Sequence, residues 1–132
     1  FADGGKADVR ILMQKNGVGK WEAGGELSRL TSAASRLTNA YTAILSPDEV
    51  ASREQLEVLY GVSELVAVTL DGKLANLGEL GVDFLIDRSG RPWILEVNGK
   101  PDKSLFRKLG DEEMLKRVYL NPLKYQQYLL GN

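Results

Sequence analysis

Hydrophobic and polar residues alternate over positions 7–14, which is the two-residue period of a β-strand. Asn16-Gly17 then provides a turn that can adopt positive φ, and residues 21–30 are expected to form the return strand. Residues 32–46 are rich in Ser, Thr and Ala; they predict a short strand near Arg36 to Asn39 and otherwise a loop. The first third of the chain is therefore expected to be a hairpin followed by an irregular segment.

A helical repeat follows. Ser46-Pro47-Asp48-Glu49 predicts a helix start, because it combines a hydroxyl cap, a proline at the first helical position and acids in the first turn. The apolar residues behind it recur every three or four positions, as in a helix with one buried face: Leu56, Leu59, Val62, Val66, Leu70, Leu74 and Leu77. Gly61 and Asp71-Gly72 interrupt this stripe and predict either two helices or a bend.

The period returns to two over residues 81–98, where a turn-forming cluster at 87–92 separates two hydrophobic runs and predicts a second β-hairpin. Asp111 is expected to cap a helix over residues 112–120, and Asn121-Pro122 to begin a final turn or two. This order of elements predicts the α+β class, with helices covering one face of an antiparallel sheet.

The composition fits one globular domain and narrows its chemistry. The 132 residues are 43% hydrophobic and 27% charged, with a net charge of -1 and no basic run, so we expect no nucleic-acid partner. No apolar run approaches the roughly 20 residues that a membrane span requires. Because the chain has no Cys and no His, disulfides and imidazole catalysis are excluded. Any chemistry must use carboxylates, Arg, Lys, amides and hard cations.

The amino end shows no export signal, so a cytoplasmic location is expected. It also lacks an initiator Met, so residues 1–132 are expected to be one domain cut from a longer protein.

The second hairpin carries the candidate chemistry. If Asp87 faces Pro92, then Asp83 faces Glu96, and the Cβ atoms of such a pair lie about 4.5–5.5 Å apart. Asn98 follows two residues later on the same face and adds an amide oxygen. Hard oxygen ligands of this kind suit Mg²⁺ with its waters and substrate phosphates.

The alternative is an exposed polar face of a hairpin whose register differs by one residue from the assumed one. If the two acids do face each other, they repel, and Asp83→Asn is expected to stabilise the metal-free protein slightly.

Two segments of the hairpin carry a family resemblance. Gly78-Glu79-Leu80-Gly81-Val82-Asp83, followed after the turn by Trp93-Ile94-Leu95-Glu96-Val97-Asn98-Gly99-Lys100-Pro101, resembles the metal-binding end of ATP-grasp enzymes. Within that superfamily the chain is most similar to endospore coat-associated proteins of the YheC/YheD type, from about Asp8 to about Leu130. The resemblance implies the carboxyl-terminal lobe of an ATP-grasp domain, whose amino-terminal lobe would precede Phe1.

The resemblance also implies roles for particular residues. Asp83, Glu96 and Asn98 match the ligands of the magnesium ions that bridge the ATP phosphates. Arg10 matches a phosphate-binding arginine in an Asp-x-Arg strand, and Arg29 resembles an arginine near the acyl-phosphate region, so both are candidate catalytic residues. Both arginines would otherwise be solvated surface residues.

Two further residues are candidates for binding the cofactor. Asn39 resembles the asparagine of a Thr-Asn motif, and Lys100 lies beside the proposed site, where it could meet a phosphate or a substrate carboxylate. The alternatives are a turn asparagine and a solvated lysine. Two departures affect this region: Ala40-Tyr41-Thr42-Ala43 replaces a loop that ends in two glycines, and Asp102 replaces a glycine.

The implied activity is ATP- and Mg²⁺-dependent ligation of a small-molecule carboxylate to an amine or a thiol through an acyl phosphate. The isolated chain is expected to be nearly inactive without the missing lobe. Two alternatives stay open: a structural or interaction module that associates with spore coat proteins on an inactive scaffold, and a nucleotide-sensing module without ligation.

Overall fold

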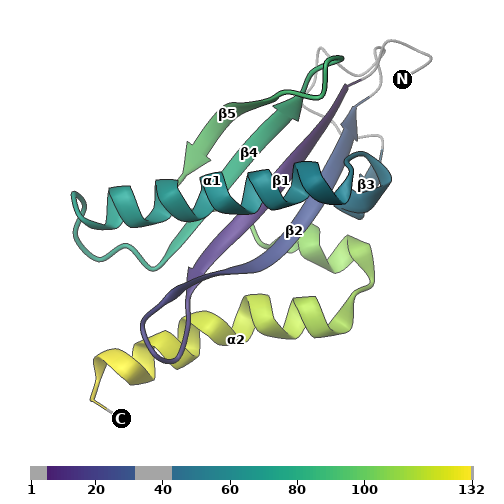
Figure 1. The fold of residues 1–132 in the computed structure, drawn as a ribbon. Helices are drawn as coiled ribbons and strands as arrows, with labels where there is room; N and C mark the ends of the chain where they lie inside the picture. Colours follow the sequence, from purple (N-terminus) through teal and green to yellow (C-terminus); the bar gives the residue numbers. More distant parts are fainter. Residues whose placement is uncertain (1–5, 32–42, 132) are drawn as a thin grey trace.

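The structure, a computed structural model, describes residues 6–31 and 43–131. Its centre is a five-stranded antiparallel sheet of order β3-β2-β1-β4-β5, so the α+β prediction is confirmed (Figure 1). The strands are β1 (Lys6–Lys15), β2 (Trp21–Thr31), β3 (Ala43–Leu45), β4 (Glu79–Ile86) and β5 (Pro92–Asn98). The helices are α1 (Arg53–Asp71) and α2 (Glu112–Leu129), with the short 3-10 helices η2 (Pro47–Glu49) and η3 (Ser104–Leu109).

Helices pack on both faces of the sheet rather than on one face, as Figure 1 shows for α1 and α2. The reason lies in the middle of β1, where Ile11, Leu12 and Met13 are all buried although neighbouring side chains point to opposite faces. Ile11 and Met13 belong to the core beneath α1, whereas Leu12 packs with residues of η3 and α2. The α2 helix and η3 therefore cover part of the face that carries the polar residues of β1.

The long helix begins later than predicted. Ser46 caps only the 3-10 turn η2, while α1 begins at Arg53, where the Ser52 hydroxyl accepts a hydrogen bond from the Gln55 amide at 3.1 Å. Gly61 does not interrupt α1, which ends at its C-cap Gly72. The predicted division at Asp71-Gly72 is thus the end of the helix.

The second helix continues through Pro122 instead of breaking there. A proline removes the N–H that would bond to the carbonyl four residues earlier, here that of Val118. The buried Gln14 amide donates to this carbonyl oxygen at 2.7 Å and so satisfies the acceptor. A side chain 104 residues away in sequence thereby allows α2 to remain one helix.

One predicted strand cannot be compared, because Arg36 to Asn39 lies outside the described residues. The strand β3 occupies Ala43–Leu45, which was expected to be loop. It pairs with Ser28–Leu30 of β2, so long-range pairing determines its conformation.

A close approach between β2 and α2 depends on Gly25. A Cβ at this position would lie 2.8 Å from Val118 Cγ2 and 3.0 Å from Phe106 Cε1, both in a buried cluster. We expect Gly25→Ala to lower the free energy of unfolding by about 1–3 kcal/mol, because the core must shift to accept the methyl group. Urea denaturation followed by circular dichroism measures the change.

The matched control is Gly61→Ala. No heavy atom lies within 4 Å of a Cβ built at Gly61, which is an exposed position inside α1. Alanine should therefore stabilise the helix there by up to about 1 kcal/mol. Equal effects of the two substitutions would contradict the close packing at Gly25.

Candidate functional site

The hairpin of β4 and β5 places the two candidate acids opposite each other, as predicted. Asp83 pairs with Glu96 and Gly81 pairs with Asn98, so both acids and the amide share one face of the sheet. The register near the turn differs, since Ile86 pairs with Pro92, and a bulge between the turn and Asp83 restores the predicted pairing.

Asp87 explains the longer turn. Its carboxylate accepts hydrogen bonds from the Ser89 hydroxyl, from the Trp93 indole, and from the Ser89 and Arg91 amides at 2.6, 2.8, 2.9 and 3.0 Å. These bonds, above all the one from the Ser89 hydroxyl, hold the pKa of Asp87 well below its usual range. This exposed carboxylate is a turn-forming group.

Two arginines converge on Asp83. Arg10 lies directly opposite Asp83 on β1 and donates from Nε and Nη2 to its two carboxylate oxygens at 2.8 and 3.0 Å. Arg29 of β2 reaches across β1 and donates from Nη2 to Asp83 Oδ2 at 2.9 Å. All three side chains are less than 10% exposed. The two arginines therefore belong to a buried charged cluster and are not solvated surface residues.

Asp8 completes this cluster. It lies opposite Arg29 on the paired strand, and its Oδ1 accepts a hydrogen bond from Arg29 Nε at 2.7 Å. Burial raises the pKa of the Asp8 carboxyl, and the Arg29 guanidinium acts in the opposite direction. We define the charged cluster as Asp8, Arg10, Arg29 and Asp83, with two positive and two negative groups.

Sequence reasoning had used Asp8 only as part of a motif. The register of the first hairpin places Asp8 directly opposite Arg29. An acid opposite an arginine on paired strands indicates an ion pair, and this is the signal that could have identified Asp8.

The remaining candidate ligands lie at the more exposed end of the site. Glu96 is exposed, and Asn98 Oδ1 accepts a hydrogen bond from the Lys100 amide at 2.9 Å. Gly81, opposite Asn98, has no side chain to obstruct the returning loop: a Cβ there would lie 3.0 Å from Pro101 Cβ. The glycine of β4 thus allows the loop after β5 to fold back beside the acids.

The donor atoms are chemically suited to magnesium. Within the described residues no group of three or more acidic side chains could hold a metal ion. A magnesium site here would have only two carboxylates, those of Asp83 and Glu96, and the Asn98 amide oxygen, and water or phosphate oxygens would have to complete the octahedral shell that Mg²⁺ prefers. Magnesium would compete with two arginines for Asp83, because both of its carboxylate oxygens accept hydrogen bonds from guanidinium groups.

The other cofactor-binding candidates contribute less to this geometry. The Lys100 side chain is exposed in the loop after β5, close to Asn98 in sequence. Asn39 lies outside the described residues.

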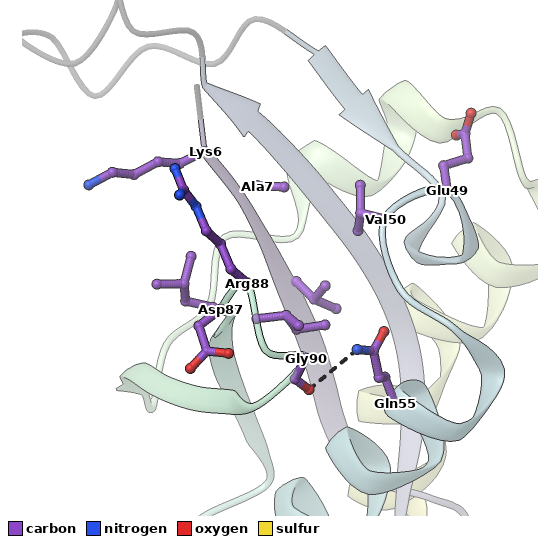
Figure 2. A pocket seen from close by; sticks show the side chains of 11 residues that line it. Lys6, Ala7, Glu49, Val50, Gln55, Asp87, Arg88 and Gly90 are labelled. Atoms are coloured by element: carbon purple, nitrogen blue, oxygen red, sulfur yellow. Dashed lines mark hydrogen bonds between the residues drawn. The ribbon is translucent and has the colours of Figure 1, made fainter. Parts of the chain in front are cut away.

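A pocket of about 740 Å³ lies elsewhere, between the start of β1, the β4–β5 turn and the amino end of α1 (Figure 2). Figure 2 shows Gln55 at its edge, where Nε2 donates to the Gly90 carbonyl at 3.3 Å. Its lining includes Val9, which belongs to the core beneath α1 and so points away from Arg10 and Asp83. We therefore place the candidate site at the charged cluster and the β5 acid, not at this pocket.

In the described ranges, neither long helix combines the length and apolarity needed to cross a membrane.

Comparisons with known proteins agree with the motifs of the second hairpin. A family model described as YheC/D-like ATP-grasp matches residues 2–129. The endospore coat-associated protein YheC of Bacillus subtilis (strain 168) is 30% identical over 133 residues, which cover 94% of this chain and 36% of the relative. The endospore coat-associated protein YheD of the same strain is 33% identical over 113 residues, covering 78% of this chain and 24% of the relative. The chain thus spans about a third or less of these relatives.

Proposed function

This chain belongs to the YheC/D-like ATP-grasp family, and from that membership we propose that it provides the magnesium- and phosphate-binding surface of an ATP-dependent ligase. The ligase joins a small-molecule carboxylate to an amine or a thiol. The γ-phosphoryl group of ATP passes to the carboxylate as ADP leaves, and the nucleophile then attacks the acyl phosphate and releases phosphate.

One observation carries this proposal: Asp83 and Glu96 are paired across the hairpin, with Asn98 on the same face and Arg10 bonded to Asp83. A magnesium ion bound there would neutralise charge on the transferring phosphoryl group. The Arg10 guanidinium has the planar fork that binds phosphate through two hydrogen bonds. Electrostatic stabilisation and positioning of this kind need neither His nor Cys.

The whole enzyme requires more than this segment. Because the relatives are much longer than the matched region, we propose that residues 1–132 form the carboxyl-terminal lobe of a two-lobed domain. The other lobe would cover ATP from the opposite side. We also propose that the protein acts in the cytoplasm in association with the spore, since YheC and YheD are described as endospore coat-associated.

A second candidate function is a structural or interaction module of the spore coat on an inactive ATP-grasp scaffold. The names of YheC and YheD favour it, since both are described as endospore coat-associated. A purely structural descendant would still need Asp83 as the counterion of Arg10 and Arg29, but it has no comparable need for the exposed Glu96 opposite it, which lies outside this charged cluster. The acid pair therefore favours the ligase.

Isothermal titration with ATP, in the presence and absence of Mg²⁺, separates the two functions. The ligase proposal expects heat of binding that depends on Mg²⁺ and disappears when EDTA is added. The longest soluble form of the protein is titrated, beside residues 1–132, because the proposed second lobe should increase the affinity. Absence of magnesium-dependent binding in the longest form would favour the structural module.

A further inference from the structure

Arg29 is held by two carboxylates at once. Its Nε donates to Asp8 at 2.7 Å and its Nη2 donates to Asp83 at 2.9 Å, so one edge of the guanidinium bridges the two acids. The bridge crosses the central strand, because Asp8 lies on β1 whereas Arg29 and Asp83 lie on the strands to either side of it.

Asp83 and Asp8 differ in the other groups that they can bind. Asp83 is opposite Glu96 and is one of the oxygen donors that a magnesium ion would use. Asp8 is two residues from Arg10 along β1 and pairs with Arg29 on β2 and with Leu85 on β4, so no acid lies directly opposite it. Its Oδ1 accepts the hydrogen bond from Arg29 Nε.

A carboxylate that turns toward a divalent cation gives up part of its bonding to arginine. Arg10 and Arg29 would then be two adjacent cations beside a third positive charge, which is unfavourable unless each finds another partner. Phosphate oxygens of ATP could replace the Asp83 carboxylate as the acceptor for Arg10, whose Nε and Nη2 both donate to Asp83. Arg29 already has a second carboxylate in place.

We propose that Asp8 is a positioning residue whose carboxylate holds Arg29 at the site when Asp83 turns to the metal; this inference rests on the function proposed above. Arg10 and Arg29 then have different roles. Arg10 exchanges its carboxylate partner for phosphate, whereas Arg29 stays bonded to Asp8 and keeps a fixed positive edge beside Asp83.

The first test needs neither metal nor nucleotide. Asp83→Asn removes the charge that Arg29 shares, and it imitates the withdrawal of Asp83. We expect the Nε–Hε cross-peak of Arg29 in ¹⁵N spectra to persist in Asp83→Asn and to broaden or vanish in Asp83→Asn/Asp8→Asn. An unchanged cross-peak in the double variant would overturn the proposal. If the Asp83 variants do not fold, Asp8→Asn is compared with wild type, and faster exchange of the Arg29 Hε is the expected result.

The second test measures affinity for Mg²⁺ and ATP by titration. Asp8→Asn is expected to weaken binding about tenfold, which is the usual effect of losing a partner that orients a site residue. Asp8→Glu should recover part of this loss, because it restores the carboxylate. The control is Asp71→Asn, which breaks the Lys15–Asp71 ion pair of 2.9 Å at the other end of β1 and should leave affinity unchanged.

The outcomes separate the two proposals. Wild-type protein that fails to bind Mg²⁺ and ATP contradicts the proposed function, while the arginine spectra still decide whether Asp8 holds Arg29. Wild-type binding with equal affinity in Asp8→Asn contradicts the positioning role alone.

Discussion

Asp83→Asn is expected to lower the free energy of unfolding of the metal-free protein by about 3–5 kcal/mol, the usual effect of removing one partner from a buried ion pair. Asp83 is 3% exposed, and its carboxylate accepts hydrogen bonds from both Arg10 and Arg29. Asparagine keeps the shape but offers no charge, so two buried guanidinium groups lose their shared counterion. Glu96 is exposed and cannot replace it at the same atoms.

Urea denaturation in the presence of EDTA measures this effect. Glu57→Gln is the matched control, because it removes an exposed carboxylate that pairs with Arg53 at 3.6 Å on the surface of α1. Exposed pairs of this type contribute about 0.2–1 kcal/mol. Wild-type stability in Asp83→Asn would mean that the arginines do not depend on Asp83.

This expected result reverses the sign that the sequence suggested. Two acids opposite each other predicted repulsion and a slight gain in stability from Asp83→Asn. The cross-strand pairing itself is confirmed, so the two expectations differ for a reason other than register. The hairpin sequence contains no sign of Arg10 or Arg29, which come from β1 and β2 and meet Asp83 only after the sheet has formed.

Local patterns predicted the strands well and the turn details less well. The alternation of apolar residues located both hairpins, because burial of one or both faces sets the two-residue period. The extended turn follows instead from hydrogen bonds of the Asp87 carboxylate with Ser89, Arg91 and Trp93. A separate bulge between Asp83 and Phe84 shifts the register back. The longer turn and the bulge shift the register in opposite directions, so the pairing at Asp83 is the predicted one. The acid pair was therefore predicted correctly although the predicted turn was too short.

Helix boundaries depended on distant contacts. Pro122 predicted a break in α2 on sound local grounds, but Gln14 supplies the hydrogen bond that the proline leaves unmade. In the same way, β3 forms where only loop was expected because β2 offers it an edge. Such compensation is visible only in three dimensions.

Glu96→Gln is expected to leave the fold unchanged and to weaken magnesium-dependent ATP binding about a hundredfold, since the number of charged ligands governs divalent-cation affinity over several orders of magnitude. The position of Glu96 explains both the unchanged fold and the weaker binding. Glu96 is exposed on the edge strand, outside the charged cluster, so its charge is not needed for folding. It lies opposite Asp83, where a cation would need it.

Titration of Glu96→Gln with ATP and Mg²⁺ is compared with the wild-type protein and with Glu57→Gln, which makes the same chemical change on α1. A loss confined to the titration with Mg²⁺ places Glu96 at the metal, because binding without the ion does not use this carboxylate. An equal loss with and without Mg²⁺ would instead indicate a general electrostatic effect. Unchanged affinity would remove Glu96 from the site and leave the charged cluster as a structural feature of the sheet.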